Sequence, residues 1–163
     1  MAKRKLDFRF HQPVKLPNGR TIHISYINHP GAVIVAPLLN QNAIVMIRQF
    51  RPALGRYIYE LPAGTIDIPE KPLTCAKREL LEETGFCAKR FQKLGKIYPV
   101  PGYSTEVIHI FKAEGLIHGN ATPEEYEVIE NIHMSKAQVK NYFRCGKIMD
   151  GKTICALAHM GWL

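Results

Sequence analysis

The sequence has 163 residues, 46% hydrophobic and 22% charged, which supports one folded domain with a substantial core and excludes a low-complexity chain. The net charge is +8, but the basic residues are scattered and have no aromatic residues interleaved among them. This pattern argues against a nucleic-acid partner and favours a small anionic ligand.

The N-terminal region predicts a soluble, cytoplasmic protein that makes no contact with a membrane. The longest apolar run, residues 32–39, is too short to cross a bilayer, and the first residues lack the hydrophobic region of a signal peptide. Residues 6–28 predict a β-hairpin that turns at Pro17-Asn18-Gly19. A lone hairpin is only marginally stable, so this one needs a surface to lie against.

Two central strands are expected at residues 32–39 and 43–50, joined as a second hairpin. The second strand ends in Arg48-Gln49-Phe50-Arg51-Pro52, and a short strand follows at 57–61. Planar guanidinium groups suit phosphate oxygens, so Arg48 and Arg51 are candidate substrate ligands. The alternative is a solvated end of a strand.

Three glutamates, Glu79, Glu82 and Glu83, follow within five residues of one predicted helix, which extends from Pro72 to Gly85. Their spacing puts them on one helical face, where two carboxylates about 4 Å apart repel by roughly 4 kcal/mol at an effective dielectric near 20. A hard cation such as Mg²⁺ or Mn²⁺ would offset that cost. The alternative is a solvated acidic face on which Arg78 pairs with Glu82.

Residues 64–86 read GTIDIPEKPLTCAKRELLEETGF. Gly64, Glu70 and residues 78–86 match the Nudix box at every defined position, so the chain resembles the Nudix hydrolases, which cleave nucleoside diphosphates linked to another moiety. The resemblance implies an α/β fold, a Nudix-type α/β/α sandwich around a mixed sheet with an N-terminal β-hairpin extension. It also implies two to three Mg²⁺ or Mn²⁺ ions per site. The metal ligands it implies are Glu79, Glu82, Glu83 and the carbonyl of Ala63, with Arg78 orienting the glutamates and both Glu82 and Arg78 in the catalytic set.

Other segments resemble the subfamily that hydrolyses ADP-ribose and nucleotide sugars. In that subfamily an arginine of the segment at residues 48–52 reaches the diphosphate or base, and Arg51 is preferred to Arg48. The loop at 98–106 carries Pro101 where the subfamily has a proline. It also carries Glu106, which the resemblance brings to the terminal ribose of a substrate in its own or in the partner subunit. Tyr103 instead matches dinucleoside polyphosphate hydrolases, and an exposed strand-start glutamate is the alternative for Glu106.

The rest of the chain predicts strands at 91–100, 107–113 and 128–134, a loop at 114–124, and helices at 135–144 and 150–159. An acidic cluster precedes the strand at 128. By resemblance Glu125 matches the general base of ADP-ribose pyrophosphatases, and Glu127 is the second candidate. A merely solvated acidic loop is the alternative.

The sequence therefore predicts a homodimeric hydrolase with a dimerisation extension at residues 1–30 and a Nudix domain at 31–163. ADP-ribose would give AMP and ribose 5-phosphate. Three alternatives stay open. They are another Nudix substrate such as a dinucleoside polyphosphate, an RNA 5′-end hydrolase, and a nucleotide-sensing module without turnover.

Overall fold

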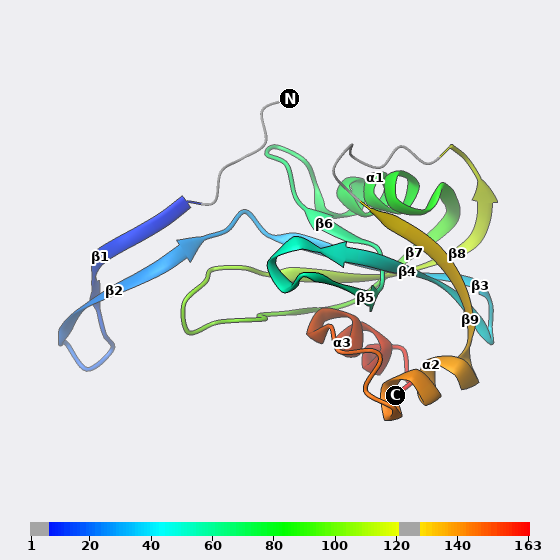
Figure 1. The fold of residues 1–163 in the computed structure, drawn as a ribbon. Coiled ribbons are helices and arrows are strands. Elements are labelled where there is room, and N and C mark those ends of the chain that lie inside the picture. The colour runs from blue at the N-terminus through cyan, green and yellow to red at the C-terminus, as the bar shows by residue number, and fades with distance from the viewer. Residues whose placement is uncertain (1–6, 121–127) are drawn as a thin grey trace.

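The computed structural model describes residues 7–120 and 128–163, which form a large mixed sheet with helices on both faces and a separate hairpin (Figure 1). The strands are β1 (Asp7–Lys15), β2 (Thr21–Asn28), β3 (Ala32–Asn40), β4 (Ala43–Arg51), β5 (Arg56–Glu60), β6 (Ala63–Thr65), β7 (Phe86–Ile97), β8 (Ile108–His118) and β9 (Ile129–Ser135). The helices are α1 (Pro72–Thr84), α2 (Lys136–Arg144) and α3 (Gly151–His159), and a 3₁₀ turn, η1, spans Pro52–Leu54.

The main sheet has the order β5-β4-β3-β8-β7, with β6 paired to β3 and β9 paired to β4. Among the described strands every pair is antiparallel except β3 with β8. The predicted hairpin of β3 and β4 exists, but the two strands pair only beside their turn, at Leu38 with Ile44 and at Asn40 with Ala43. Beyond the turn, β3 pairs with β6 and β8, whereas β4 pairs with β5 and β9.

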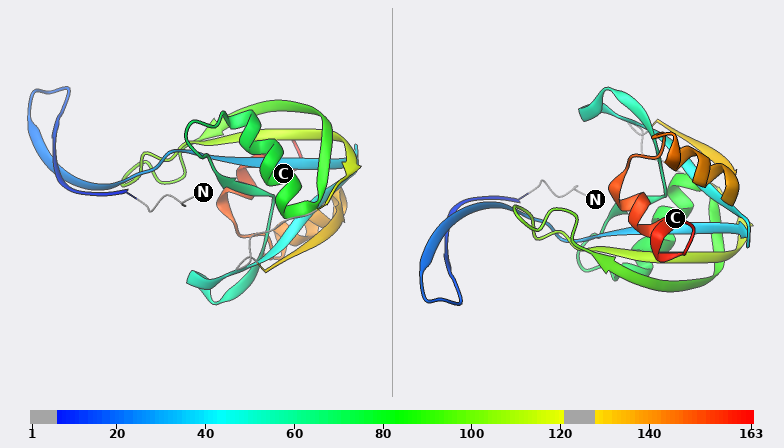
Figure 2. Two further views of the ribbon diagram at one scale, coloured as in Figure 1. Left: turned by 90° about the horizontal axis from the view of Figure 1, so that it is seen from above. Right: turned by 90° about the horizontal axis from the view of Figure 1, so that it is seen from below.

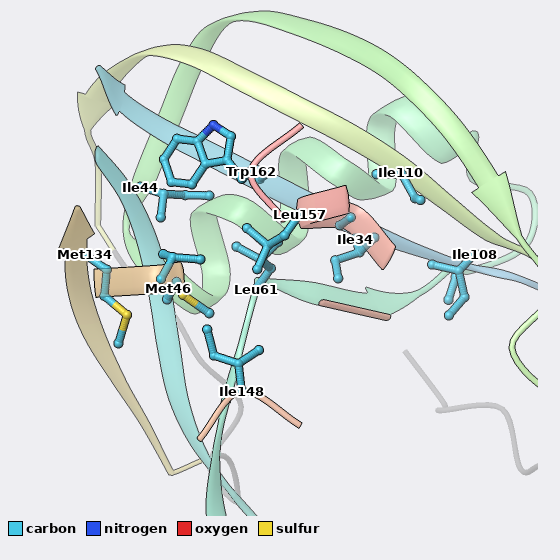
Figure 3. Packing of buried hydrophobic residues seen from close by; sticks show 14 residues of the cluster. Ile34, Ile44, Met46, Leu61, Ile108, Ile110, Met134, Ile148, Leu157 and Trp162 are labelled. Atoms are coloured by element: carbon cyan, nitrogen blue, oxygen red, sulfur yellow. The ribbon is translucent and has the colours of Figure 1, made fainter. Parts of the chain in front are cut away.

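Strand β3 is buried on both faces, which explains its continuous apolar sequence. Ile34 points into a core shared with α2, α3 and the C-terminus, while Val33 and Val35 point into a second core beneath α1. Figure 3 shows the first core, where Leu157 and Trp162 pack near the strand side chains. The layers are thus helix, sheet and helix, which confirms the predicted sandwich.

Helix α1 has the predicted bounds. It begins at Pro72 without a side-chain cap from Lys71, and it ends at Gly85, whose φ of 72° is left-handed and whose N–H donates to the Leu81 carbonyl. Its buried side includes not only Cys75, Ala76 and Leu80 but also Glu79 and Glu83. Two of the three clustered glutamates therefore face the sheet rather than the solvent.

Helices α2 and α3 also follow the prediction, because each begins at a capping side chain. Ser135 and Gln138 form a capping box on α2, and the Asp150 carboxylate accepts a hydrogen bond from the Thr153 N–H at the start of α3.

None of the described helices is long and apolar enough to cross a membrane.

Two predicted boundaries are wrong. The strand expected from residue 91 begins at Phe86, and residues 114–118, expected as loop, belong to β8. Phe86 is 5% exposed because it packs beneath α1 while it pairs with His118. Gly115, with φ of 68°, tolerates a left-handed conformation inside β8, so Glu114-Gly115 does not end the strand.

The N-terminal hairpin forms its own two-stranded sheet and projects away from the rest of the chain in both views of Figure 2. Its end is tied to the loop before β8, because Ile27 N–H donates to the Tyr103 carbonyl at 2.8 Å and Thr105 N–H donates to the Ile27 carbonyl at 3.0 Å. Phe8 and Phe10 on β1 are 54% and 69% exposed. The hairpin thus carries large apolar side chains that the described part of the chain leaves uncovered.

Candidate active site

Arg78 is the centre of the polar cluster on α1. Its Nη1 donates to Glu79 Oε1 at 2.6 Å and to Glu82 Oε2 at 2.9 Å, while Nε and Nη2 donate to the two oxygens of Glu70 at 3.2 and 3.0 Å. These bonds, first those to Glu70, raise the pKa of Arg78. Burial alone would raise the pKa of Glu70, but the bonds and charge of Arg78 outweigh it and lower that pKa. One guanidinium thus ties the loop before α1 to the helix.

Strand β6 lies directly against the glutamates. The Ala63 N–H donates to Glu83 Oε2 at 2.9 Å. A Cβ built on Gly64 would overlap the Glu79 carboxylate, so only glycine allows the helix to come this close. The glycine at position 64 and the glutamate at position 79 of the box therefore depend on each other, because the Glu79 carboxylate fills the space that a side chain at 64 would need.

The donor chemistry of this cluster suits a hard divalent cation, because three carboxylates and the backbone of Ala63 supply only oxygen ligands. In the described residues no three metal-ligating side chains stand in ready ligand geometry, since Arg78 holds Glu79 and Glu82. Cys75 lies beside the cluster, 3.5 Å from the Thr65 carbonyl, but burial raises the pKa of its thiol. A thiolate ligand is therefore disfavoured, whereas the oxygens of Glu83, and those of Glu79 and Glu82 once these two leave Arg78, suit the ion.

A cavity of about 800 Å³ opens beside β6, at the end of the sheet where β3 begins and β4 ends. Three predicted site residues, Ala63, Arg51 and Glu106, line it together, although they come from different parts of the chain. The other lining residues are Ala32, Val33, Gly64, Thr65, Ile97, Tyr98, Pro99, Ile108, Asp150, Gly151, Lys152 and Cys155.

Arg51 is held in the cavity wall by Glu60, the last residue of β5. Its Nε and Nη2 donate to the two carboxylate oxygens of Glu60 at 2.6 and 2.7 Å, and Lys152 binds the same carboxylate. Burial raises the pKa of Glu60, but the bonds from Arg51 and the charge of Lys152 outweigh it, so the pKa falls below its ordinary value. Glu60 is therefore a buried, ionised anchor.

Other predicted residues lie elsewhere. Arg48 pairs with Glu130 at 2.9 Å, stacks 4.0 Å from the centre of the Tyr57 ring and is not among the residues that line the cavity. Pro101 lies in an exposed turn outside the cavity wall. Glu106, by contrast, lines the cavity, and its Oε1 is 3.8 Å from His29 Nε2. Glu125 and Glu127, the candidate bases, fall outside the described residues.

Residues 28–149 match the sequence model of the NUDIX domain. The chain belongs to the Nudix family. The match spans β3 to β9 and α2, and it includes the whole of the glutamate cluster, so the box that the sequence predicted is the polar cluster of α1.

Three proteins of similar sequence align over most of the chain. A methanol dehydrogenase activator of Bacillus methanolicus is 36% identical, with 90% of this chain and 80% of that protein covered. An ADP-ribose pyrophosphatase of Bacillus subtilis is 34% identical over 91% of this chain and 82% of its own. A GDP-mannose pyrophosphatase of Salmonella typhimurium is 33% identical, with 80% and 72% covered.

A solved structure of an ADP compounds hydrolase has the same fold. It superposes with a TM-score of 0.80 at 19% identity and covers 98% of this chain and 94% of the other. At that identity the likeness concerns the arrangement of the elements. Its coverage reaches beyond residues 28–149 of the family model and includes the hairpin and α3.

Sequence reasoning missed Asp150 and Lys152 as lining residues of the cavity, and it missed Glu60, which lies buried behind the wall and binds Arg51 and Lys152. The sequence carried one signal for Glu60, because this carboxylate stands beside the apolar Leu61 and three residues before Ala63. Asp150 was predicted only as the start of α3. Asp150 Oδ1 forms an ion pair with Lys152 Nζ at 2.9 Å, a contact that no sequence spacing indicates.

We expect Gly64→Ala to weaken Mn²⁺ binding at least about tenfold, the usual effect of disturbing the surroundings of a metal ligand. The added methyl group would overlap the Glu79 carboxylate and push it aside. Calorimetric titration with Mn²⁺ measures the change. Gly102→Ala is the control, because a Cβ there meets open space. Equal Mn²⁺ affinity in both variants would remove Glu79 from the metal site.

Proposed function

We propose that this protein hydrolyses the diphosphate linkage of ADP-ribose or a related nucleoside diphosphate sugar, giving a nucleoside monophosphate and a sugar phosphate. The observation that carries the proposal is the shared cavity. Arg51 lines one wall of it and the Ala63-Gly64 backbone, which contacts the glutamates of α1, lines another. A diphosphate in the cavity would lie between a guanidinium and the carboxylate helix. The names of the similar ADP-ribose and GDP-mannose pyrophosphatases support the substrate class.

In this proposal Glu79, Glu82, Glu83 and the Ala63 carbonyl hold two to three Mg²⁺ or Mn²⁺ ions. Such ions neutralise phosphate charge and lower the pKa of a bound water. Arg78 keeps the glutamates oriented before the ions bind, through the bonds it makes to Glu79 and Glu82. Arg51 binds the diphosphate through the part of its guanidinium that Glu60 does not use, and Glu106 contacts the terminal ribose. Roles for Arg48 and Pro101 in substrate binding rest on the sequence alone.

A general base must come from outside the α1 cluster. A carboxylate bound to a divalent cation loses basicity, so Glu79, Glu82 and Glu83 are poorly suited to take the proton of the attacking water. Glu125 is our first candidate and Glu127 the second, by their place in the acidic segment before β9.

We also propose that the protein is a cytoplasmic homodimer, with residues 1–30 as the dimerisation element. The exposure of Phe8 and Phe10 and the isolation of the hairpin support this. A second copy of the chain would cover these rings and give the hairpin the surface that it lacks.

A turnover screen tests the substrate. We expect kcat/KM for ADP-ribose or a close nucleotide sugar to exceed that for diadenosine polyphosphates, because the cavity has a cationic wall suited to one diphosphate. The screen includes capped RNA as a further substrate. Excess EDTA is the control, and it should abolish turnover. Higher kcat/KM for diadenosine polyphosphates would favour the role suggested by Tyr103. Full activity in excess EDTA would exclude the metal.

Paired variants test the base. We expect Glu125→Gln to lower kcat at least about a hundredfold while substrate affinity survives, since a positioned base usually contributes that much. Glu127→Gln is the matched comparison. If Glu127→Gln shows the loss instead, the role belongs to Glu127, and if neither variant does, the base lies outside the acidic segment.

Sedimentation tests the dimer. We expect about twice the chain mass of 18.5 kDa at micromolar concentration, and a shift to the monomer for Phe10→Asp, because a charge in an apolar contact is costly to bury. Ile117→Asp is the control, a similarly exposed position on β8. A fully active monomeric wild type would contradict both the dimer and any contact of Glu106 across it.

A further inference from the structure

We propose that Glu60 is a positioning residue that holds Arg51 and Lys152 side by side as one cationic subsite for the phosphates of the substrate. This deepens the proposed function and rests on it, because Arg51 is the diphosphate ligand there. The new elements are Lys152, which lies on the C-terminal helix, and the buried carboxylate that joins it to Arg51.

The anchor is completely enclosed. Glu60 has no exposed side-chain surface, whereas the side chains of Arg51 and Lys152 are 37% and 20% exposed and both line the cavity. A carboxylate of this kind would be costly to bury without partners. Its two partners come from opposite parts of the chain, Arg51 from the end of β4 and Lys152 from the first turn of α3.

Both cations keep donors for a ligand. In the described part of the chain Arg51 donates to Glu60 from Nε and Nη2, which leaves its Nη1 donors for the cavity. The Lys152 ammonium has three N–H donors. One of them is used by Glu60, and the ammonium also forms an ion pair with Asp150 at 2.9 Å. Glu60 thus fixes one edge of each cation in the wall and leaves the other edge for phosphate oxygens.

Fixing the two side chains in advance matters because both are long. Arg and Lys lose more rotamer freedom than most side chains when a ligand orders them. A carboxylate that already orders them removes that loss from the binding step. It also offsets the repulsion between two positive groups that would otherwise move apart.

The backbone secures the same geometry. Asp150 accepts a hydrogen bond from the Thr153 hydroxyl at 2.6 Å, and that hydroxyl accepts one from the Leu61 N–H at 2.9 Å. The first turn of α3 is therefore bonded to the residue that follows Glu60. Lys152 and Glu60 are held in register by this link as well as by their own ion pair.

The direction in which Glu60→Gln changes anion affinity distinguishes a positioning role of Glu60 from a purely electrostatic one. If Glu60 only contributed its negative charge to the cavity, Glu60→Gln would strengthen the binding of an anion. If Glu60 positions the two cations, the same variant weakens that binding, because Arg51 and Lys152 lose their shared anchor.

The test measures pyrophosphate binding by calorimetry in the presence of Mg²⁺, together with kcat and KM for the best substrate of the screen. We expect Lys152→Met and Glu60→Gln each to weaken pyrophosphate binding at least about tenfold and to raise KM, with kcat changed less than about threefold. Lys152→Arg should restore most of the affinity. The double variant Glu60→Gln with Lys152→Met should lose less pyrophosphate affinity than the product of the two single losses, because the two residues act as a unit.

Lys140→Met is the control, since it removes the same charge from an exposed position on α2. Tighter pyrophosphate binding by Glu60→Gln, or unchanged binding by Lys152→Met, would overturn the proposal. If Glu60→Gln does not fold, the cycle of Arg51→Met with Lys152→Met decides, because independent losses would contradict a shared subsite and coupled losses support it. Wild-type protein that binds pyrophosphate but hydrolyses no nucleotide sugar would refute the proposed function and leave this inference standing.

Discussion

The approach of α1 to β6 is the constraint on which the site depends. At Gly64 the backbone comes so near to the helix that a carboxylate oxygen of Glu79 occupies the space of a side chain, and one residue earlier the Ala63 N–H binds Glu83. This contact requires α1 to present two glutamates to the sheet, which an ordinary amphipathic helix would not do. The apolar residues Cys75, Ala76 and Leu80 on the same helix supply the burial that holds it there.

Charge is then compensated in two separate clusters. Arg78 bonds to Glu70, Glu79 and Glu82 on α1, and Glu60 bonds to Arg51 and Lys152 between β5 and α3. Removing one member of a buried ion pair commonly costs about 3 to 5 kcal/mol, because the other charge is left without a partner. Such clusters contribute little net stability, but they allow few alternative arrangements. The rigid geometry that results is suited to a ligand with closely spaced negative charges.

Local pattern was enough to predict most of the fold. Pro72 and Gly85 mark the ends of α1, and Ser135 and Asp150 mark the starts of the next two helices, because caps and turns act within a few residues. The start of β7 was missed because the burial of Phe86 depends on α1 and on its partner His118, far along the chain. The glutamates could be predicted from their spacing on a helix. The link from Glu60 to Lys152 could not, since it joins residues that only the folded chain brings together.

The short pairing of β3 with β4 has a consequence for the shape of the cavity. Beyond the pair of Leu38 and Ile44 the two strands no longer pair with each other. The chain after β5 lies beside β3 instead, where the Val35 N–H donates to the Pro62 carbonyl at 2.8 Å. Ala32 and Arg51, at the far ends of the diverging strands, both line the cavity. Strands β3 and β4 therefore diverge from the turn at residues 40–43 toward the cavity. The pairing of the two strands ends beside this turn, so the space between their far ends depends on a turn that does not itself line the cavity.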